Sequence, residues 1–514
     1  GSGRGLNGKL TADITVNTGD VSGCGGTKAG GWRDWTPINS YSGIFDGCGK
    51  TISGLYLSSD IGVALFGYGM FGTVKNLTLT NSYFSGGEDT AGICGINNGT
   101  IQNCVNEATV CGTGFNIGGI CDQNQGGTIS GCTNRGSVTG LSYYVGGVCG
   151  SNNGSGTVEN CTNSGTATGL AAVGGVCGVC GENATGCSIT NCYNTGDVTG
   201  TGTAGNVGGI CGLLAIGALS DCGNTGAVSG TCYIGGIAGL NGGTISSAYN
   251  TGTVSGTYYI GGIAGLNGGT VTNAYNTGVV TGSSNQVGGI AGLNESSAVI
   301  TNAYYLADCA KDGDGTVQYG IGNATQGSTT ADVAGSTTVK TAEQFASGEV
   351  CWLLNGSTST GVWKQDIDND VTPYDASPNF TGAAVYYLGS QSKYTNNAAG
   401  EIVSVDITWG AMEFTYSDGT WNAATHQYDG AGWTAAEGGN AVTVKNSGTA
   451  AVTATVSYTQ AEDYIGITGS FDSDVTAAIA INEEKKWLLS LSGKPAEAMS
   501  NIKLGTVTVT IGGE

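Results

Sequence analysis

The sequence is poor in proline, histidine and charge, and each shortage excludes a class of structure or chemistry. Only 4 of the 514 residues are proline, 11% are charged, and His426 is the single histidine. One histidine cannot supply the two-histidine helix motif of a zinc protease. A serine–histidine triad would depend on His426, and no G-x-S-x-G nucleophile elbow accompanies it. We therefore expect no catalytic residues, and we place His426 in a turn of a β-domain.

Long apolar runs and positive charge are also scarce. No run approaches the roughly 18 residues of a membrane-spanning helix, so we expect no membrane insertion. The 16 Lys and Arg residues are outnumbered by 38 Asp and Glu, which gives a formal net charge of −22. This balance disfavours nucleic acid as a partner, because few side chains could neutralise its phosphates.

Glycine is abundant, with 97 residues, and it belongs to a repeated pattern. The segment "GGIAGLNGGTISSAYNTGTVSG" starts at Gly235 and nearly repeats from Gly261. Related copies start at residues 91, 118, 146, 174, 208 and 288, in steps of 26 to 28 residues with one step of 34. Each copy holds three short β-like runs and no helical period. The pattern predicts a parallel β-solenoid with about three strands per 27-residue turn.

Two residue types recur at fixed places in the repeat. A branched aliphatic residue follows the glycine pair: Ile93, Ile120, Val148, Val176, Ile210, Ile237, Ile263 and Ile290. An asparagine stands in each "YNTG"-like corner: Asn106, Asn134, Asn163, Asn194, Asn224, Asn250 and Asn276. We expect the aliphatic residues to form an apolar column inside the coil. The asparagines should form a ladder of amides at left-handed corners; a polar binding stripe is the alternative.

The regions on either side of the repeats differ from them. We expect residues 1–90 to be an N-terminal cap with irregular first coils, residues 91–308 the solenoid, and residues 309–395 a C-terminal cap. The segment "TAEQFASGEVCWLLNG" (341–356) is the best helical candidate and should pack over the end of the rod. Residues 396–514 alternate like strands separated by turns, which indicates an immunoglobulin-like β-sandwich. The fold class is therefore all-β.

Eighteen cysteines at regular intervals suggest disulfides and an exported protein. Five repeats carry cysteine at two positions: Cys94 with Cys104, Cys121 with Cys132, Cys149 with Cys161, Cys177 with Cys192, and Cys211 with Cys222. The last three repeats have alanine at both positions. This concordance favours a disulfide within each turn. Duplication of two repeat types would give the same pattern, and bonding between turns along a column is also geometrically open.

Eight cysteines remain outside these columns. Local pairs are Cys24 with Cys48, Cys180 with Cys187, and Cys309 with Cys351. Cys111 and Cys232 lie about four turns apart, too far to bond directly, so they are free or available for intermolecular links.

Acidic residues give two weaker hypotheses. Possible structural Ca²⁺ ligands are Asp312 and Asp314 in "KDGDG", and Asp366, Asp368 and Asp370 in "QDIDND". Neither segment follows the EF-hand pattern, and plain solvated turns are the alternative. The acids within the repeats, Glu107, Asp122, Glu159, Glu182, Asp197, Asp221 and Glu295, do not recur at one position. No acidic column would therefore line a groove, which argues against carbohydrate cleavage.

The repeat "GGIAGLNGGTISSAYNTGTVSG" resembles the GLUG motif of large bacterial surface and secreted proteins, which also occurs outside the catalytic region of IgA1-cleaving metalloproteases. "GIFDGCGKTISGLYL" and "TAEQFASGEVCWLLNG" are similar to the segments that flank such repeats. "WGAMEFTYSDGTWNAATHQYDGAGW" is similar to domains appended to surface proteins of gut Firmicutes. The resemblance implies an extracellular or cell-surface bacterial protein.

We therefore expect a non-enzymatic adhesin or display rod with no cofactor. Its partner would be a protein or glycan on a host or neighbouring cell. One alternative is a self-assembling subunit of an extracellular fibre, with the C-terminal "LGTVTVTIGG" as the strand most suited to strand addition. The other is a carbohydrate-active β-helix enzyme.

Overall fold

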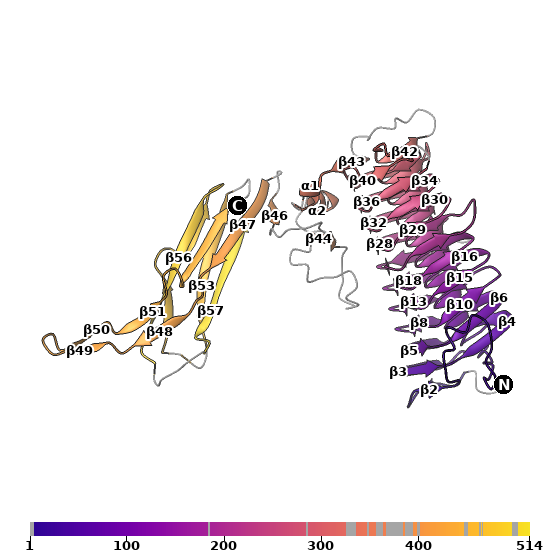
Figure 1. The fold of residues 1–514 in the computed structure, drawn as a ribbon, viewed down its shortest axis with the longest axis horizontal. Helices are drawn as coiled ribbons and strands as arrows, with labels where there is room; N and C mark the ends of the chain where they lie inside the picture. Colours follow the sequence, from indigo (N-terminus) through magenta and orange to yellow (C-terminus); the bar gives the residue numbers. More distant parts are fainter. Residues whose placement is uncertain are drawn as a thin grey trace.

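The computed structural model describes residues 5–182, 186–283, 286–324, 336–346, 349–355, 363–365, 384–385, 394–397, 401–446, 451–461, 464, 466–495 and 502–513. The solenoid occupies the N-terminal part and the β-sandwich the C-terminal part (Figure 1).

Three parallel sheets run along the solenoid as its three faces. The first sheet contains β1 (Gly8–Lys9), β2 (Ile14–Thr15), β3 (Ile44–Ser53), β5 (Thr73–Thr80), β8 (Thr100–Gln102), β9 (Val105–Asn106), β13 (Thr128–Ser130), β14 (Thr133–Asn134), β18 (Thr157–Glu159), β19 (Thr162–Asn163), β23 (Ser188–Thr190), β24 (Tyr193–Asn194), β28 (Ala218–Asn224), β32 (Thr244–Asn250), β36 (Thr270–Asn276), β40 (Val299–Leu306) and β43 (Thr337–Lys340). The second contains β4 (Tyr56–Val63), β6 (Tyr83–Ala91), β10 (Thr109–Gly112), β11 (Ile117–Gly118), β15 (Val138–Gly140), β16 (Tyr143–Gly146), β20 (Ala167–Gly169), β21 (Ala171–Gly174), β25 (Val198–Gly200), β26 (Val207–Gly208), β29 (Val228–Ser229), β30 (Cys232–Gly235), β33 (Val254–Gly256), β34 (Tyr258–Gly261), β37 (Val280–Gly282), β38 (Val287–Gly288) and β41 (Ala310–Lys311). The third contains β7 (Cys94–Asn97), β12 (Cys121–Gln125), β17 (Cys149–Asn153), β22 (Cys177–Cys180), β27 (Cys211–Leu214), β31 (Ala238–Asn241), β35 (Ala264–Asn267), β39 (Ala291–Asn294) and β42 (Ile321–Ala324).

Successive turns pair in register, so equivalent residues of each repeat stack. In the third sheet, for example, Cys121 pairs with Cys94 on one side and Cys149 on the other. The predicted parallel β-solenoid is confirmed, but its three faces hold more strands than the three per turn expected: the turn from Cys121 to Gly146 has five, β12 to β16. The predicted apolar column is confirmed too, because every branched residue that follows the glycine pair is fully buried.

The asparagine ladder is a buried structural element. All seven asparagines are buried, and each of the first six donates its side-chain N–H to the side-chain oxygen of the next at 2.7–2.8 Å. The second glycine of each pair makes room for the ladder: a Cβ at Gly147 would lie 2.4 Å from Asn163. Burial rules out the alternative of a polar binding stripe. A similar second ladder, which the sequence analysis missed, links Asn97, Asn124 and Asn152.

The backbone geometry predicted for the ladder asparagines is wrong. The left-handed residues lie three positions earlier, at Asn103, Asn160, Asn191 and Asn273 (φ 51–53°). At these positions the chain turns sharply, and the side chain that follows is buried. The ladder asparagines themselves lie in or beside strands. Asparagine tolerates this region of φ/ψ space better than other non-glycine residues.

Regular coils begin before residue 91. β5 pairs with both β3 and β8, and β6 pairs with both β4 and β10. Irregularity is found in residues 16–43, which form turns and bends with isolated bridges at Asp34 and Ile38, and in a register shift between Asp46 and Lys50 of β3. Short strands β1 and β2 add to the far side of β3.

The predicted helical segment forms α1 (Ala342–Ala346) and α2 (Glu349–Leu354). A capping box starts α1, because Thr341 Oγ1 accepts the Gln344 N–H and Gln344 Oε1 accepts the Thr341 N–H. The prediction that this segment packs over the end of the rod is wrong. The helices lie on its side beside β36 and β40, because tyrosines there offer an apolar surface (Figure 1).

The C-terminal domain is an immunoglobulin-like β-sandwich of antiparallel sheets. The larger sheet has the order β46 (Tyr394–Asn397), β47 (Glu401–Trp409), β52 (Ala441–Asn446), β56 (Glu484–Ser492), β54 (Thr468–Phe471), and the smaller β55 (Thr476–Ile479), β53 (Val452–Gln460), β57 (Gly505–Gly513). Two ribbons extend it, β48 (Phe414–Ser417) with β51 (Gly432–Ala435) and β49 (Thr420–Asn422) with β50 (Gln427–Asp429); β44 (Lys364–Gln365) pairs with β45 (Ala384–Val385). Trp487 is fully buried at the centre of the core.

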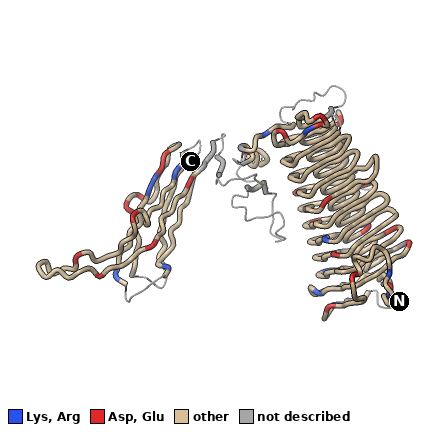
Figure 2. The backbone as a smooth tube through the Cα atoms, viewed as in Figure 1, with Lys and Arg blue, Asp and Glu red and all other residues tan. Residues whose placement is uncertain are grey.

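Charge is spread thinly over the solenoid, with acidic and basic residues isolated from one another on most turns (Figure 2). Within the part of the chain that the structure describes, no helix is long and apolar enough to cross a membrane.

Candidate functional site

One bend within the second sheet carries side chains in an unfavourable backbone conformation. Its left-handed residues are Asp89, Asn116, Tyr144, Ala172, Tyr233 and Tyr259, with φ between 48° and 63°. Each precedes a residue that faces the core and pairs with its equivalent in the next turn. We call this column the left-handed corner. Tyrosine and alanine pay a steric cost there of about 1–2 kcal/mol per residue, and such strain concentrates at functional sites.

Aromatic side chains of the left-handed corner stack between turns. Tyr233 and Tyr259 have parallel rings with centroids 5.0 Å apart. Phe115 and Tyr143, each one position upstream of a left-handed residue, stack at 5.6 Å. Phe115, Tyr143 and Tyr258 are each 46–49% exposed. The corner therefore presents aromatic faces to solvent at two heights along the rod.

Tyr144 connects the corner to the inserted segment of the long repeat. Its hydroxyl forms a hydrogen bond with the carboxylate of Glu182. Burial, together with that hydrogen bond and the negative charge of Glu182, raises the pKa of Tyr144 to about 12. The longer repeat thus supports an aromatic side chain of the corner.

A second tyrosine column lies on the first sheet and is covered. Tyr249, Tyr275 and Tyr304 occupy equivalent positions in successive turns, and Tyr249 stacks on Tyr275 at 5.4 Å. Phe345 of α1 and Trp363 lie 5.8 and 5.5 Å from the Tyr275 ring. We call this the covered column, because it forms one buried cluster with the helical segment.

The two predicted cysteine columns exist, but the contacts between their cysteines join neighbouring turns along the rod. All eighteen cysteines are thiols in the structure. Within one column Cys121 interacts with Cys94 and Cys149, and within the other Cys161 interacts with Cys132 and Cys192. The Cys104 N–H also points at the sulfur of Cys132, at 3.5 Å. Disulfides within a turn stay a prediction, and these contacts favour the alternative of bonding between turns.

The remaining cysteines are distributed differently from the predicted pairs, with one exception. The sulfur atoms of Cys180 and Cys187 lie 3.3 Å apart, in contact but not bonded, so their disulfide stays a prediction. Cys24 packs with Cys111 around Tyr83, whereas its predicted partner Cys48 is exposed in β3.

The last predicted pair, Cys309 with Cys351, divides between two clusters. Cys309 ends the asparagine ladder in the main core, and Cys351 belongs to the cluster of the covered column. Cys232, predicted to be free or intermolecular, is half-buried beside Tyr233 at the left-handed corner.

The predicted calcium ligand Asp312 is used by its own turn. Its carboxylate accepts the N–H groups of Asp314 and Thr316 and the side-chain N–H of Gln318. This arrangement explains the "KDGDG" pattern without an ion. Asp366, Asp368 and Asp370 lie outside the described residues. Among the residues that are described, no group of three or more metal-binding side chains gathers.

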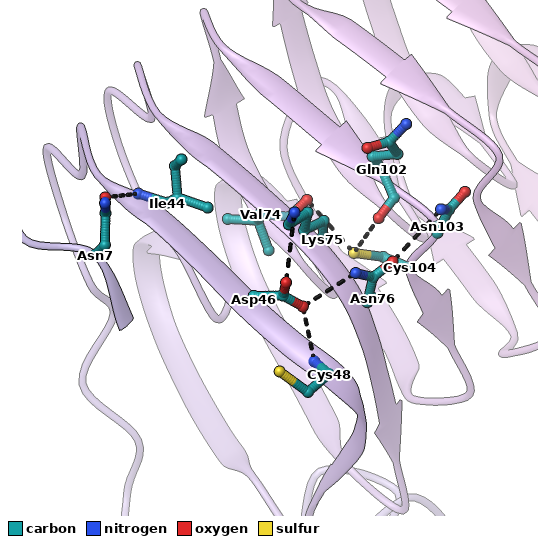
Figure 3. A network of polar contacts seen from close by, with 10 residues as sticks. All are labelled: Asn7, Ile44, Asp46, Cys48, Val74, Lys75, Asn76, Gln102, Asn103 and Cys104. Atoms are coloured by element: carbon teal, nitrogen blue, oxygen red, sulfur yellow. Dashed lines mark hydrogen bonds and ion pairs between the residues drawn. The ribbon is translucent and has the colours of Figure 1, made fainter. Parts of the chain in front are cut away.

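The polar network at the first coils is also structural (Figure 3). Asp46 accepts the N–H of Cys48 and the side-chain N–H of Asn76, and it pairs with Lys75 at 3.4 Å. These contacts, the Cys48 N–H above all, lower the pKa of Asp46. Asn76 in turn accepts from Asn103, so the network ties successive corners together.

His426 lies in a turn, as predicted, at the exposed end of the β49–β50 ribbon. Trp421 and Tyr428 of that ribbon are 51% and 59% exposed, and their ring centroids lie 5.1 Å apart. The ribbon is a second exposed aromatic group, built on the β-sandwich.

Comparison with known proteins gives short or distant matches. The model of "the GLUG motif" matches residues 142–168, which span β16, β17, β18 and β19. Halomucin of Haloquadratum walsbyi is 41% identical over 87 residues, 16% of this chain and 1% of halomucin. The chain thus spans a very small part of that relative. A crystal structure of a presumed immunoglobulin A1 protease from Bacteroides ovatus is 18% identical, with 70% of this chain and 83% of that one covered. Its TM-score is 0.27, too low to carry a structural argument.

The matched segment is one turn among many that share its register. β16 pairs with β11 and β21, and β18 pairs with β13 and β23, at equivalent positions. One turn of the solenoid thus matches the GLUG motif, and the turns stacked on either side of it share its register.

Proposed function

We propose that this chain is an extracellular, non-enzymatic display rod that binds a partner surface through its left-handed corner. The observation that carries this proposal is the aromatic column of the left-handed corner, where the exposed Phe115, Tyr143 and Tyr258 each stand directly before a left-handed residue. The half-buried Tyr144, Tyr233 and Tyr259 occupy left-handed positions that glycine or asparagine would fill at lower steric cost, which suggests that their side chains are used.

The partner that suits the corner best is a glycan on a host or neighbouring cell. Flat aromatic faces such as those of Tyr143 and Tyr258 pack against the C–H faces of sugars, and their hydroxyl groups supply hydrogen bonds. The net charge of −22 disfavours strongly anionic partners. GLUG repeats and the similarity to halomucin support an extracellular setting for such a contact.

A glycan array probed with the whole chain tests this proposal. We expect binding to a subset of neutral glycans, and a loss of at least tenfold in affinity for Tyr143→Ala and for Tyr258→Ala. Val279→Ala is the matched control, because Val279 is as exposed as these tyrosines but lies outside the corner. Equal binding by all four proteins, or no binding at all, would contradict the proposal.

Fibre assembly is a second candidate, and one observation favours it. β57 is an outer strand of the three-stranded sheet, and it pairs with β53 along nine residues, from Gly505 to Gly513. A long, regular outer strand is a suitable template for strand addition. Negative-stain microscopy of the purified chain would show long fibres in this case and separate rods in the first. A proline at Val509, which pairs with Val456, should abolish fibres without altering glycan binding.

A further inference from the structure

One repeat carries a carboxylate where its neighbours have glycine. Asp122 lies between Cys121 and Gln123 of β12, and the register of β12 with β17 places it beside Gly150. At Gly150, an added Cβ would lie 2.7 Å from the backbone nitrogen of Ile117, in the left-handed corner of the turn before. The side chain of Asp122 is therefore directed toward the equivalent corner of its own preceding turn, which contains Asp89.

The carboxylate of Asp122 is shielded from solvent, with the side-chain amide of Gln123 near it. Its exposed fraction is 0%, and both oxygens lack a hydrogen-bond partner. A buried charge without partners costs considerable free energy, so a compensating group is expected beside it.

The surroundings of Asp122 supply oxygen atoms and negative charge. Asp89, on β6, interacts with Asp122 and accepts a hydrogen bond from the side chain of Gln123 at 2.6 Å. The hydroxyl of Tyr68 also interacts with Asp89, and Glu88 lies nearby. Cys149 is the other titratable group recorded as acting on Asp122. None of these ionisable neighbours, Glu88, Tyr68 and Cys149, is basic.

We propose that Asp89 and Asp122 bind a divalent cation, and that Ca²⁺ is the ion the site fits best. Two carboxylates with a hydroxyl nearby form an all-oxygen donor set, which hard cations prefer. Ca²⁺ tolerates irregular geometry, whereas Mg²⁺ requires an almost ideal octahedron. Asp89 is only half-buried, so an ion could reach the pair from solvent.

The bound ion would link two turns at the N-terminal end of the corner. Asp89 belongs to the second sheet of one turn and Asp122 to the third sheet of the next. A cation shared between them would hold these sheets together at the first left-handed corner. This site differs in place and in residues from the "KDGDG" turn, in which Asp312 is already occupied by hydrogen bonds.

Metal analysis of the whole chain tests the site. After dialysis against Ca²⁺ and removal of free ions, we expect one equivalent of Ca²⁺ bound to the wild type. Asp122→Gly should lose that equivalent, and since it restores the glycine of neighbouring repeats it should fold normally. Asp312→Asn is the matched control and should retain the ion. Ca²⁺ should also raise the Tm of the wild type and of Asp312→Asn, but not that of Asp122→Gly.

Several outcomes would overturn the proposal. Equal Ca²⁺ content in the wild type and Asp122→Gly would show that the ion binds elsewhere. Loss of Ca²⁺ in Asp312→Asn alone would place it at the "KDGDG" turn. If Ca²⁺ neither binds to the wild type nor changes its Tm, the two aspartates share a proton instead of a cation. Asp89→Asn tests whether Asp89 itself is a ligand of the ion. If it is, this substitution should weaken Ca²⁺ binding at least tenfold.

Discussion

The solenoid carries two tyrosine columns, and they differ in what covers them. The covered column stacks Tyr249 on Tyr275 beneath Phe345 and Trp363, and Tyr275 is fully buried. The left-handed corner stacks Tyr233 on Tyr259, and its neighbour Tyr258 remains 49% exposed. In-register turns align aromatic side chains in both places, so stacking alone does not decide the role of a column.

The two columns show that a surface of the repeat can be buried by another segment of the chain or remain exposed to solvent. The covered column needs its tyrosines for stability, because the described residues of the helical segment bury their apolar side chains against them. The corner holds its tyrosines in a left-handed conformation that opposes stability. Replacing a tyrosine in the covered column should therefore reduce stability far more than replacing one at the corner.

The largest effect is expected in the covered column. Tyr275→Ala leaves a cavity beneath Phe345 and Trp363, so it should lower the free energy of unfolding by about 3–5 kcal/mol. Tyr258→Ala, at the exposed corner, should change it by no more than about 0.5 kcal/mol. Urea unfolding followed by circular dichroism measures both. Similar losses in the two variants would remove the distinction between the columns.

The next effect concerns the cover itself. Phe345→Ala removes an aromatic contact to Tyr275, and α1 and α2 have few other contacts of this kind. We expect the free energy of local opening of the helical segment to fall by about 3 kcal/mol. This corresponds to roughly a hundredfold loss of hydrogen-exchange protection in residues 342–354.

The strands of the solenoid serve as the internal reference in that experiment. Their protection should stay unchanged, because the first sheet is closed by its own ladder bonds. Tyr143→Ala is the matched control and should leave the helical segment protected. If Phe345→Ala instead reduced protection throughout the rod, the helices would be an integral part of the solenoid rather than its cover.

A smaller effect separates strain from stacking at the corner. Ala172 has φ 48° and no aromatic contact, so Ala172→Gly should raise the free energy of unfolding by about 1 kcal/mol. Ala171→Gly, one residue earlier and not left-handed, should lower it by about 0.5–1 kcal/mol. Thermal and urea unfolding measure the pair. A loss of stability in both variants would mean that the corner is not strained.

Much of this architecture follows from the sequence, because a repeated residue in a parallel stack must meet its own copy. That argument predicts the buried column from Ile93 to Ile290 and the ladder from Asn106 to Asn276. It places left-handed geometry incorrectly, because propensity favours asparagine while the chain turns at a residue three positions earlier, such as Asn103.

The candidate sites were less predictable. Tyr144 and Tyr259 have low propensity for a left-handed corner, so no local rule points to them. The sideways packing of α1 depends on tyrosines distant in sequence, which a local pattern does not reveal. Asp122 did carry a signal, since it interrupts a column of glycines. That signal becomes informative only with the register that places Asp89 beside it.

The smallest expected effect is a pH dependence at the corner. Burial, with the hydrogen bond and charge of Glu182, raises the pKa of Tyr144 to about 12, from about 10 in the unfolded chain. Between these values the folded state keeps a proton that the unfolded state has lost. The contribution of Tyr144 to stability is therefore complete below about pH 10 and is lost as the pH rises through about 12.

Glu182→Gln tests this link between the long repeat and the corner. Removing the negative charge should lower the pKa of Tyr144 toward its ordinary value, because the carboxylate disfavours the tyrosinate. The ultraviolet absorbance of tyrosinate, compared between the wild type and Tyr144→Phe, isolates this one titration. Glu159→Gln, a change of the same charge on the first sheet, should leave the titration unmoved. An unchanged titration in Glu182→Gln would mean that burial alone sets the pKa of Tyr144, and that the inserted segment does not support the exposed column.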